Sequence, residues 1–367
     1  MAKRILVITG GGDCPGLNAV IRGIVKRASI EGGWEVIGCI ESFNGLLKHD
    51  SIEIVSLTER TVSGIHVKGG TILKTINRGG PFQFPVRQSD GTWTTEDRSE
   101  LLKERLKNMG IEAVINIGGD GSQRISIALS DIGINMVGVP KTIDNDISST
   151  DFTFGFQTAV QIATEALDKL VTTAESHNRI FIMEVMGRDA GWIALHSAVA
   201  AGADVCLIPE IPYNLEKIIE KINTRYNDNE GFCNIVIAEG AVALDGQVTG
   251  SAPPEAGNPH IKLGGVGEKL KRELMEAGIE HDIRVTVLGH LQRGGTPLAY
   301  DRILATEFGV KAFEMVKNKE YRRMVTYRHP KISSISLEEA IKKPNFVDPA
   351  NSWLVHTAKG IGMSLGN

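Results

Sequence analysis

Cysteines are few in this 367-residue sequence, long apolar runs are missing, and neither sign of charge predominates. The 40 Lys and Arg nearly balance the 44 Asp and Glu, which argues against a protein built mainly to bind nucleic acid or an anionic membrane. The four cysteines are scattered and form no CxxC pair, so a reduced, cytoplasmic protein is expected. No apolar run approaches the ~18 residues of a membrane helix, and residues 1–4 lead directly into a predicted strand, unlike a signal peptide.

Familiar catalytic signatures are missing as well. The Gly-rich segment 10–23 contains neither G-x-G-x-x-G nor GK[ST], so it is neither a dinucleotide fingerprint nor a Walker A loop. No Ser-His-Asp or Cys-His pattern and no cluster of zinc ligands is found. These absences argue against an NAD-dependent oxidoreductase, triad-type nucleophilic catalysis and zinc catalysis.

Glycine, by contrast, is abundant, at 41 of 367 residues or about 11%, against a usual ~7%. Several glycines close short apolar, β-rich runs, a pattern typical of buried parallel strands that end in a turn. The six clearest runs are residues 5–8, 113–117, 134–139, 180–185, 235–238 and 285–288, of which 134–139 is closed by Pro140.

Between the predicted strands, residues 157–174 carry apolar side chains at nearly a 3.6-residue period, which predicts a helix. Alternating strands and helices over this length predict an α/β fold of two doubly wound domains with mostly parallel sheets. The polar, turn-rich stretches 81–100 and 245–260 are predicted to be surface loops without a chemical role.

Three motifs follow predicted strands, where ligands of doubly wound sheets bind. GGGDCPGLNAVIRG (10–23) and GGDGS (118–122) would let backbone amides approach phosphate, and Asp120 is a candidate Mg²⁺ ligand. PKTIDND (140–146) supplies a cation, a hydroxyl and two carboxylates, one predicted to face substrate while the other holds the loop. The structural alternatives are a tight βα turn for 10–23 and an Asx turn for 140–146.

Basic residues also gather at predicted strand ends, among them Arg179, Arg188, Arg284, His290 and Arg293. The planar fork of arginine suits phosphate oxygens, although single arginines are usually solvated and a lone histidine is more often structural. A metal-holding aspartate, a candidate base, phosphate cradles and several arginines are together the requirements of phosphoryl transfer. So many arginines favour an acceptor that is itself phosphorylated.

With MGRDAG (186–191) and LGHLQRGGTPLAYDR (288–302), these motifs resemble the 6-phosphofructokinase family in order and spacing, over residues 3 to 320. The resemblance implies that ATP, with Mg²⁺ as cofactor, phosphorylates the 1-hydroxyl of fructose 6-phosphate. It also implies an active site in the cleft between the domains. The larger, donor-binding domain would comprise residues 1–155 plus 292–342, and the smaller, fructose 6-phosphate domain residues 156–291 plus 343–367.

Residue roles follow from the same resemblance. Asp144 would be the general base, with Thr142 and Arg188 as further catalytic residues, and Asp120 would hold the metal. The donor would contact Gly11, Arg78, Gly119, Asp120, Gly121, Ser122 and Lys141. The sugar phosphate would contact Thr142, Asp144, Arg179, Met186, Gly187, Arg188, Glu239, Arg284, His290 and Arg293.

The resemblance further implies that Arg179 and Arg284 reach the 6-phosphate of a neighbouring subunit, so that the protein is a homo-oligomer, a dimer or a tetramer. No nucleic acid or membrane partner is expected. At the effector site of regulated relatives, Arg22 and Lys26 remain, but Val171 and the segment 227–230 stand where cations are expected. Regulation by ADP or phosphoenolpyruvate is therefore predicted to be weak or absent.

The phosphoryl donor is decided by few positions. ATP-dependent relatives have glycine where this chain has Gly121, because a carboxylate there would collide with the α-phosphate of a nucleotide and repel it. Lys141 is instead typical of pyrophosphate-dependent relatives. Near the donor, Lys74 and Asn77 depart from the family pattern, and Arg78 stands one position from the usual arginine. ATP is predicted, with pyrophosphate or dual use as the alternative.

Two further alternatives have sequence features against them. NAD kinase-like and lipid kinase-like proteins share GGDG but lack the TIDND and LGHLQRGG segments. A catalytically silent regulatory subunit should have lost a metal ligand or a catalytic group, yet Asp120, Asp144 and Arg188 are all present.

Overall fold

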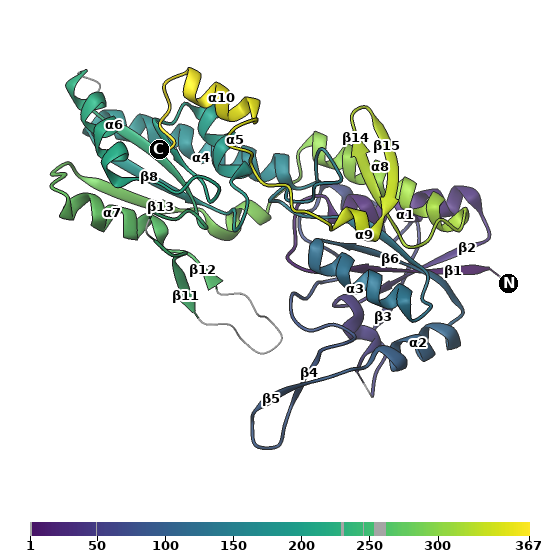
Figure 1. The fold of residues 1–367 in the computed structure, drawn as a ribbon. Helices are drawn as coiled ribbons and strands as arrows, with labels where there is room; N and C mark the ends of the chain where they lie inside the picture. Colours follow the sequence, from purple (N-terminus) through teal and green to yellow (C-terminus); the bar gives the residue numbers. More distant parts are fainter. Residues whose placement is uncertain (1, 49, 229–230, 245, 253–261) are drawn as a thin grey trace.

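The computed structural model describes residues 2–48, 50–228, 231–244, 246–252 and 262–367 and has two lobes, each built on its own sheet (Figure 1). The larger sheet has the order β15-β14-β7-β6-β1-β2-β3, and only the edge strands β3 and β15 pair antiparallel. Its strands are β1 (Lys3–Thr9), β2 (Trp34–Cys39), β3 (Ile54–Leu57), β6 (Ile111–Gly118), β7 (Met136–Pro140), β14 (Arg323–Arg328) and β15 (Lys331–Ser336).

The smaller sheet has the order β13-β8-β10-β9, and its four strands are all parallel. They are β8 (Ile180–Val185), β9 (Val205–Leu207), β10 (Cys233–Ala238) and β13 (Ile283–Val287). The six strands predicted from apolar runs are β1, β6, β7, β8, β10 and β13, so the predicted α/β class with mostly parallel sheets is confirmed.

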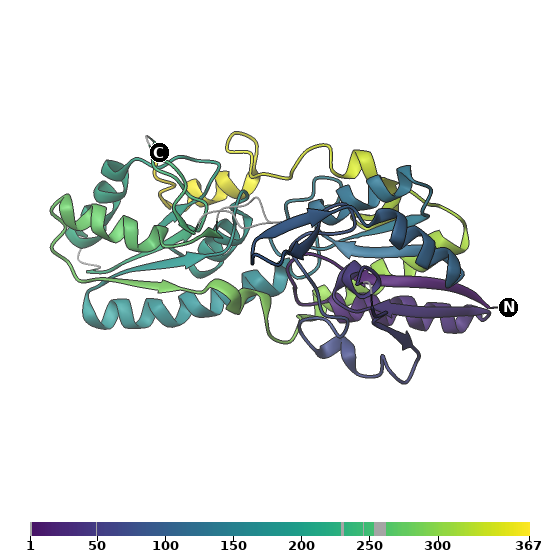
Figure 2. The ribbon, with the colours of Figure 1, turned by 90° about the horizontal axis from the view of Figure 1, so that it is seen from below.

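Helices cover both faces of the sheets, as the second view shows (Figure 2). Residues 5–8 of β1 are therefore completely buried, which explains their uninterrupted apolar run. The helices are α1 (Leu17–Glu31), α2 (Ser99–Asn108), α3 (Asp120–Asp131), α4 (Phe156–His177), α5 (Trp192–Ala201), α6 (Leu215–Asn227), α7 (Val266–Glu276), α8 (Ala299–Lys317), α9 (Leu337–Ala340) and α10 (Trp353–Gly360), with 3₁₀ turns η1 (Ser42–Leu46), η2 (Ile65–Val67) and η3 (Gly289–Arg293). In the described part of the chain, none of them is long and apolar enough to span a bilayer.

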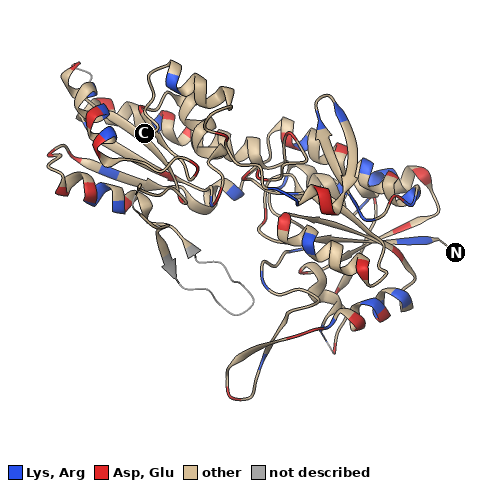
Figure 3. Cartoon of the chain, in the orientation of Figure 1, with Lys and Arg blue, Asp and Glu red and all other residues tan. Residues whose placement is uncertain are grey.

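The chain passes between the lobes three times. It crosses from β7 to α4, returns through η3 to α8, and crosses again between α9 and α10 (Figure 1). The core is shared across these crossings, because one cluster of buried side chains includes Val7 of the large sheet, Phe154 and Phe156 of the first crossing, and Val185 of the small sheet. Acidic and basic residues are interspersed on both lobes (Figure 3).

The prediction of a loop over 81–100 is wrong. This stretch holds a two-stranded hairpin, β4 (Phe84–Arg87) and β5 (Trp93–Glu96), and the first residues of α2. All four residues of β5 are exposed, so the hairpin shows no apolar alternation; the Arg98 guanidinium lies 4.1 Å from the Phe84 ring and covers it. In the predicted loop 245–260, the strand β11 (Gly250–Ala252) pairs with β12 (Lys262–Leu263), while residues 245 and 253–260 lie outside the described residues.

Candidate active site

Three loops at the carboxyl edge of the large sheet enclose a cavity of about 210 Å³. They follow β1, β6 and β7, which are neighbours in the sheet, so their carboxyl ends meet at one place. Arg293 of η3 closes the cavity from the crossing between the lobes. The lining residues are Gly11, Gly12, Asp13, Gly119, Asp120, Gly121, Ser122, Lys141, Thr142, Ile143, Asp144, Asp146 and Arg293.

The glycine-rich loop after β1 does not present its first amides to a ligand, contrary to the expectation from the sequence. The Gly10 amide donates to the carbonyl oxygen of Ile117 (2.9 Å), and the Gly11 amide donates to that of Ile76 (3.0 Å). Glycine is required at position 12 because the Arg293 side chain packs against it: a Cβ at Gly12 would collide with Nη1 of Arg293. Gly11 also has φ 77°, as the alternative of a tight turn requires, while Gly11 and Gly12 both line the cavity.

The second predicted phosphate loop has amides suited to a phosphate. Residues 120–122 form the first turn of α3, and the cap residue Gly119 offers no side-chain acceptor to them. The first N–H groups of a helix lack intrahelical partners and carry the positive end of the helix dipole, which favours anions. A Cβ at Gly121 would meet no described atom within 4 Å, so this position faces open space.

Lys141 is a buried cation, with 5% of its surface exposed. Its Nζ donates to the carbonyl oxygen of Gly12, beneath the first loop. Burial lowers the pKa of Lys141, and the nearby Arg293 guanidinium lowers it further, while Asp13 and Asp146 oppose the shift. The lysine therefore links the loops after β1 and β7 and adds positive potential beneath the cavity.

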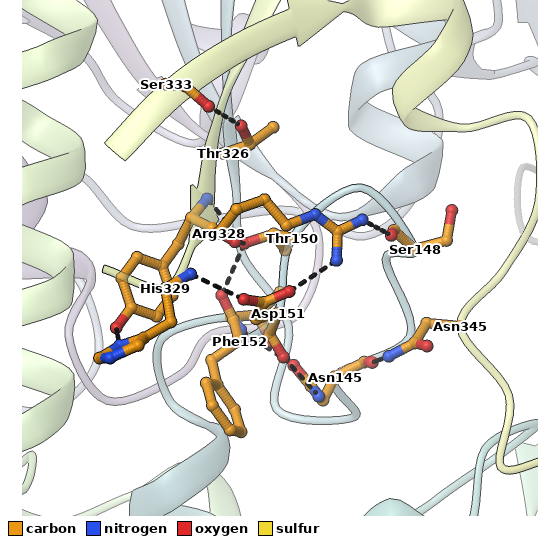
Figure 4. A network of polar contacts seen from close by, with 12 residues as sticks. Asn145, Ser148, Thr150, Asp151, Phe152, Thr326, Arg328, His329, Ser333 and Asn345 are labelled. Atoms are coloured by element: carbon orange, nitrogen blue, oxygen red, sulfur yellow. Dashed lines mark hydrogen bonds and ion pairs between the residues drawn. The ribbon is translucent and has the colours of Figure 1, made fainter. Parts of the chain in front are cut away.

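Asp144 and Asp146 both line the cavity, and the Thr142 side chain hydrogen-bonds to Asp146, so Asp146 can also hold the loop. Asn145 also holds the loop, in the left-handed region (φ 52°): its Oδ1 accepts from the Thr153 amide (2.9 Å), and its Nδ2 donates to the carbonyl oxygen of Asp151 (3.3 Å), the latter seen in Figure 4. The Asp144 amide donates to Oγ1 of Thr142 (3.0 Å), and Oδ1 of Asp144 is buried without a hydrogen-bond partner among the described residues. Thr142 therefore orients the backbone of Asp144.

Both carboxyl groups are shifted toward the protonated form. Burial, followed by the charge of Asp146, raises the pKa of Asp144 to about 7, against the opposing charges of Arg293 and Lys141. Burial also raises the pKa of Asp146, and the charge of Asp120 adds to that shift. A carboxylate with a pKa near neutrality and one unpaired buried oxygen is suited to accept a proton.

Arg188 follows β8 and Glu239 follows β10 in the smaller lobe, and neither lines the cavity, although the charge of Glu239 adds to the raised pKa of Asp144. Burial raises the pKa of Glu239, Glu184 raises it further, and the guanidinium groups of Arg293 and Arg188 oppose the shift. Glu239 therefore lies within the electrostatic field of both arginines. Sequence analysis missed Glu184, whose buried carboxylate accepts from the amides of Gly265 (3.0 Å) and Gly267 (2.9 Å).

Met186 and Gly187 lie between β8 and the Arg188 loop. Met186 is buried in the shared core. Gly187 has φ 134°, and a Cβ there would approach the carbonyl oxygen of Ala190 to 2.8 Å, so only glycine fits without strain. Its own carbonyl oxygen accepts from the Gly240 amide (3.3 Å), which ties the loop after β8 to the end of β10.

The structure does not bring every predicted residue to the cavity. Arg179 and Arg284 lie at the amino ends of β8 and β13, at the sheet edge opposite Arg188, and both donate to Oδ2 of Asp282 (2.7 and 2.9 Å). His290 is exposed in η3, and Arg78 is exposed two residues beyond Ile76. None of these four lines the cavity.

The carboxylates fit a hard cation that is also bound by phosphate oxygens. No group of three or more His, Cys, Asp or Glu in the described part of the chain is arranged to bind a metal ion by itself. Mg²⁺ typically takes only one or two carboxylates and completes its shell with water and substrate phosphates. Asp120 meets this need: it is exposed at the first turn of α3, lines the cavity with Asp144 and Asp146, and now pairs with Arg124 (2.9 Å).

Comparisons with known proteins agree on one family. The family model for phosphofructokinase matches residues 4–316. The ATP-dependent 6-phosphofructokinase 2 of Clostridium perfringens is 48% identical over 100% of this chain and 99% of its own length. The pyrophosphate–fructose 6-phosphate 1-phosphotransferase of Streptomyces coelicolor is 44% identical over 95% and 97%. The phosphofructokinase structure from Saccharomyces cerevisiae has a TM-score of 0.75 and 32% identity, over 93% of this chain and 45% of the yeast chain.

Proposed function

The chain belongs to the phosphofructokinase family, and from that premise we propose that it transfers the terminal phosphoryl group of ATP to the 1-hydroxyl of D-fructose 6-phosphate. The products are fructose 1,6-bisphosphate and ADP. The observation that carries the proposal is the position of Asp144: its carboxylate, with a pKa near neutrality, shares one cavity with the amide-rich end of α3. A base and a phosphate site in one cavity are what transfer to a hydroxyl requires.

Asp144 accepts the proton of the 1-hydroxyl as the hydroxyl oxygen bonds to the γ-phosphorus and the bond from that phosphorus to the bridging oxygen breaks. The electron pair of the broken bond stays on ADP, and Asp144 ends the step protonated. Thr142 fixes the Asp144 backbone through its hydroxyl. Arg188 is assigned to the transferred group, whose charge a guanidinium stabilises.

Phosphofructokinases generally use Mg²⁺ with ATP, and here Asp120 would hold the ion, which neutralises phosphate charge when bound. Gly119, Gly121 and Ser122 would receive the donor phosphates at the amino end of α3. The cavity of about 210 Å³ is smaller than pockets that hold whole drug-sized ligands, so the nucleoside would extend past Gly121 into the open space there. Gly11, Arg78 and Lys141 complete the proposed donor site.

Glu239, Met186, Gly187, His290 and Arg293 would bind the sugar phosphate together with Thr142, Asp144 and Arg188. Arg179 and Arg284 would bind the 6-phosphate of a second subunit. Their place at the far edge of the small sheet supports this, because they lie away from the cavity of their own chain. The protein would thus be a cytoplasmic homodimer or homotetramer with shared active sites.

The domain division remains part of the proposal. Residues 1–155 plus 292–342 would form the donor domain, and residues 156–291 plus 343–367 the sugar-phosphate domain. In support, every strand of the seven-stranded sheet falls in the first set and every strand of the four-stranded sheet in the second. The C-terminal helix α10 packs against α5 of the smaller lobe.

The deciding experiment measures fructose 1,6-bisphosphate formation by the purified protein with Mg²⁺ and either ATP or pyrophosphate. Turnover with ATP alone is expected. Pyrophosphate remains the second candidate donor because of Lys141, and turnover with pyrophosphate alone would overturn the ATP assignment. Turnover with neither donor would overturn the proposed function altogether.

A further inference from the structure

The segment between α9 and α10 makes the third crossing between the lobes and passes the active-site loops (Figure 1). Pro344 forms an antiparallel bridge with Ile147, just after the Asp144 loop. No local sequence signal marks this segment as functional. Its contacts join the two loops that carry Asp144 and Arg188.

Asn345 holds the Asp144 loop through two hydrogen bonds. Its backbone amide donates to the carbonyl oxygen of Asp146 (2.7 Å), and its Nδ2 donates to that of Asn145 (2.8 Å), as Figure 4 shows for the side chain. The two peptide carbonyls that follow Asp144 most closely in this loop, those of residues 145 and 146, are thus fixed by one half-buried residue.

The same segment holds the Arg188 loop on its other side. Nε1 of Trp192, the first residue of α5, donates to the carbonyl oxygen of Asn345 (2.7 Å). Two residues further on, the Val347 amide donates to Oε1 of Glu210 (2.8 Å), and the Glu210 carboxylate also accepts from the Gly191 amide (3.0 Å). The loop 186–191 is therefore anchored to this segment at its carboxyl end.

We propose that Asn345 is a positioning residue that fixes the Asp144 loop against the Arg188 loop. The inference rests on the proposed function, in which the base and the arginine must act together on one phosphoryl group. The two residues follow strands of different sheets, so a link between the lobes is needed to fix their separation. A misplacement of about 1 Å in a reacting group can lower the rate about 10²-fold.

Two single substitutions and their combination test this link. Asn345→Ala removes the Nδ2 donor and keeps the backbone contacts, and Trp192→Phe removes the Nε1 donor while keeping an aromatic ring beside His196. Each is expected to lower kcat with ATP roughly 5- to 50-fold. KM for fructose 6-phosphate should stay within about 3-fold, because most of the proposed contacts to the sugar phosphate, such as Glu239, His290 and Arg293, are not moved, whereas the transfer step needs Asp144 and Arg188 in exact register. The double variant should lose less than the product of the two single losses, because both act on one link.

Asn351→Ala is the matched control. Asn351 lies in the same crossing segment, and its Nδ2 also donates one hydrogen bond, to Oδ2 of the exposed Asp348 (2.9 Å). Its removal should leave kcat unchanged. Thermal unfolding of all variants separates misplacement from loss of fold, because a positioning defect lowers kcat at temperatures where the variant is fully folded.

The outcomes are distinct. A wild-type protein without activity on fructose 6-phosphate overturns the proposed function and this inference with it. An active wild type with Asn345→Ala and Trp192→Phe both within twofold of its kcat overturns the inference alone. So do multiplicative losses in the double variant, or an Asn351→Ala loss equal to that of Asn345→Ala.

Discussion

Asp144 and Asp146 face the same cavity, and the negative charge of Asp146 helps to hold the pKa of Asp144 near 7. A general base must be deprotonated before it can take the hydroxyl proton. As the pH falls through about 7, Asp144 becomes protonated, so kcat should decline with decreasing pH, by roughly tenfold between pH 8 and pH 6. Asp144→Asn should lower kcat roughly 10²- to 10⁴-fold at pH 8, with substrate binding retained.

The residual activity of Asp144→Asn supplies the control, because it should lack the decline near pH 7 that the wild type shows.

Whether Asp144→Asn is correctly folded can be checked from the direction in which the substitution changes thermal stability. The folded-state pKa is raised above the unfolded value near 3.8, so the folded protein binds more protons between about pH 4 and pH 7, and Asp144 destabilises the fold increasingly as the pH rises through that window. Asp144→Asn should therefore have a higher Tm than wild type at pH 8. Near-normal turnover by this variant would remove Asp144 from the role of base.

The open space at Gly121 allows the prediction of ATP as donor to be tested by substitution without disturbing the fold. Because a Cβ there meets no described atom within 4 Å, Gly121→Asp should fold with an unchanged Tm. Its carboxylate would repel the α-phosphate, lowering kcat/KM for ATP by roughly tenfold or more, since unfavourable like-charge contacts cost several kcal/mol. Gly121→Asn and Gly121→Ala separate collision from charge repulsion. If kcat/KM for ATP falls in Gly121→Asn but not in Gly121→Ala, the side chain collides with the nucleotide. If it falls only in Gly121→Asp, the negative charge is the cause. Normal ATP kinetics in Gly121→Asp would refute the explanation of donor choice.

Features with a local signature could be predicted from the sequence, and features made by distant contacts could not. Apolar runs closed by glycine or, at Pro140, by proline located six parallel strands, and the spacing of acids and glycines located the Asp120 and Asp144 loops. Asn345 gave no signal, because its partner Asn145 is 200 residues away. Glu184 was hidden in an apolar strand, since its carboxylate is satisfied by amides some 80 residues further along the chain, those of Gly265 and Gly267.

Which side chains of a loop line the cavity could not be predicted from the sequence either. The left-handed residue Asn145 (φ 52°) separates two aspartates that both line the cavity, and no local pattern in PKTIDND predicts that arrangement. Likewise, the apolar runs placed arginines at strand ends without distinguishing the two edges of the sheet. That distinction separates Arg188, at the carboxyl edge, from Arg179 and Arg284, at the amino edge.

The predicted weakness of effector regulation has support from one ion pair. Nζ of Lys26 lies 2.8 Å from Oε2 of Glu59, whose other oxygen accepts from the Ser29 hydroxyl (2.7 Å). A carboxylate beside Lys26 opposes the binding of an anionic effector there, and Val171 adds no charge; of the segment 227–230, residues 229 and 230 lie outside the described residues. Initial rates at subsaturating fructose 6-phosphate should change less than twofold with millimolar ADP or phosphoenolpyruvate. A sigmoidal or strongly shifted response would contradict the prediction.

Because Arg179 and Arg284 share Asp282 at the edge of the small sheet opposite Arg188, their proposed role requires a second subunit, and complementation can test it. Arg179→Ala and Asp144→Asn should each be nearly inactive alone. In a hybrid dimer, one site carries both defects, but the other combines an intact Asp144 with an intact Arg179 from its neighbour. Mixing the variants under conditions that allow subunit exchange should therefore restore activity, up to about a quarter of that of the wild type. Arg323→Ala mixed with Asp144→Asn is the control: among the described residues the Arg323 side chain bonds only to Ser334 within its own hairpin, so Arg323→Ala should be active alone and the mixture should gain no activity beyond its own. No recovery in the Arg179 mixture, despite exchange verified by native mass spectrometry, would place both residues outside a shared site.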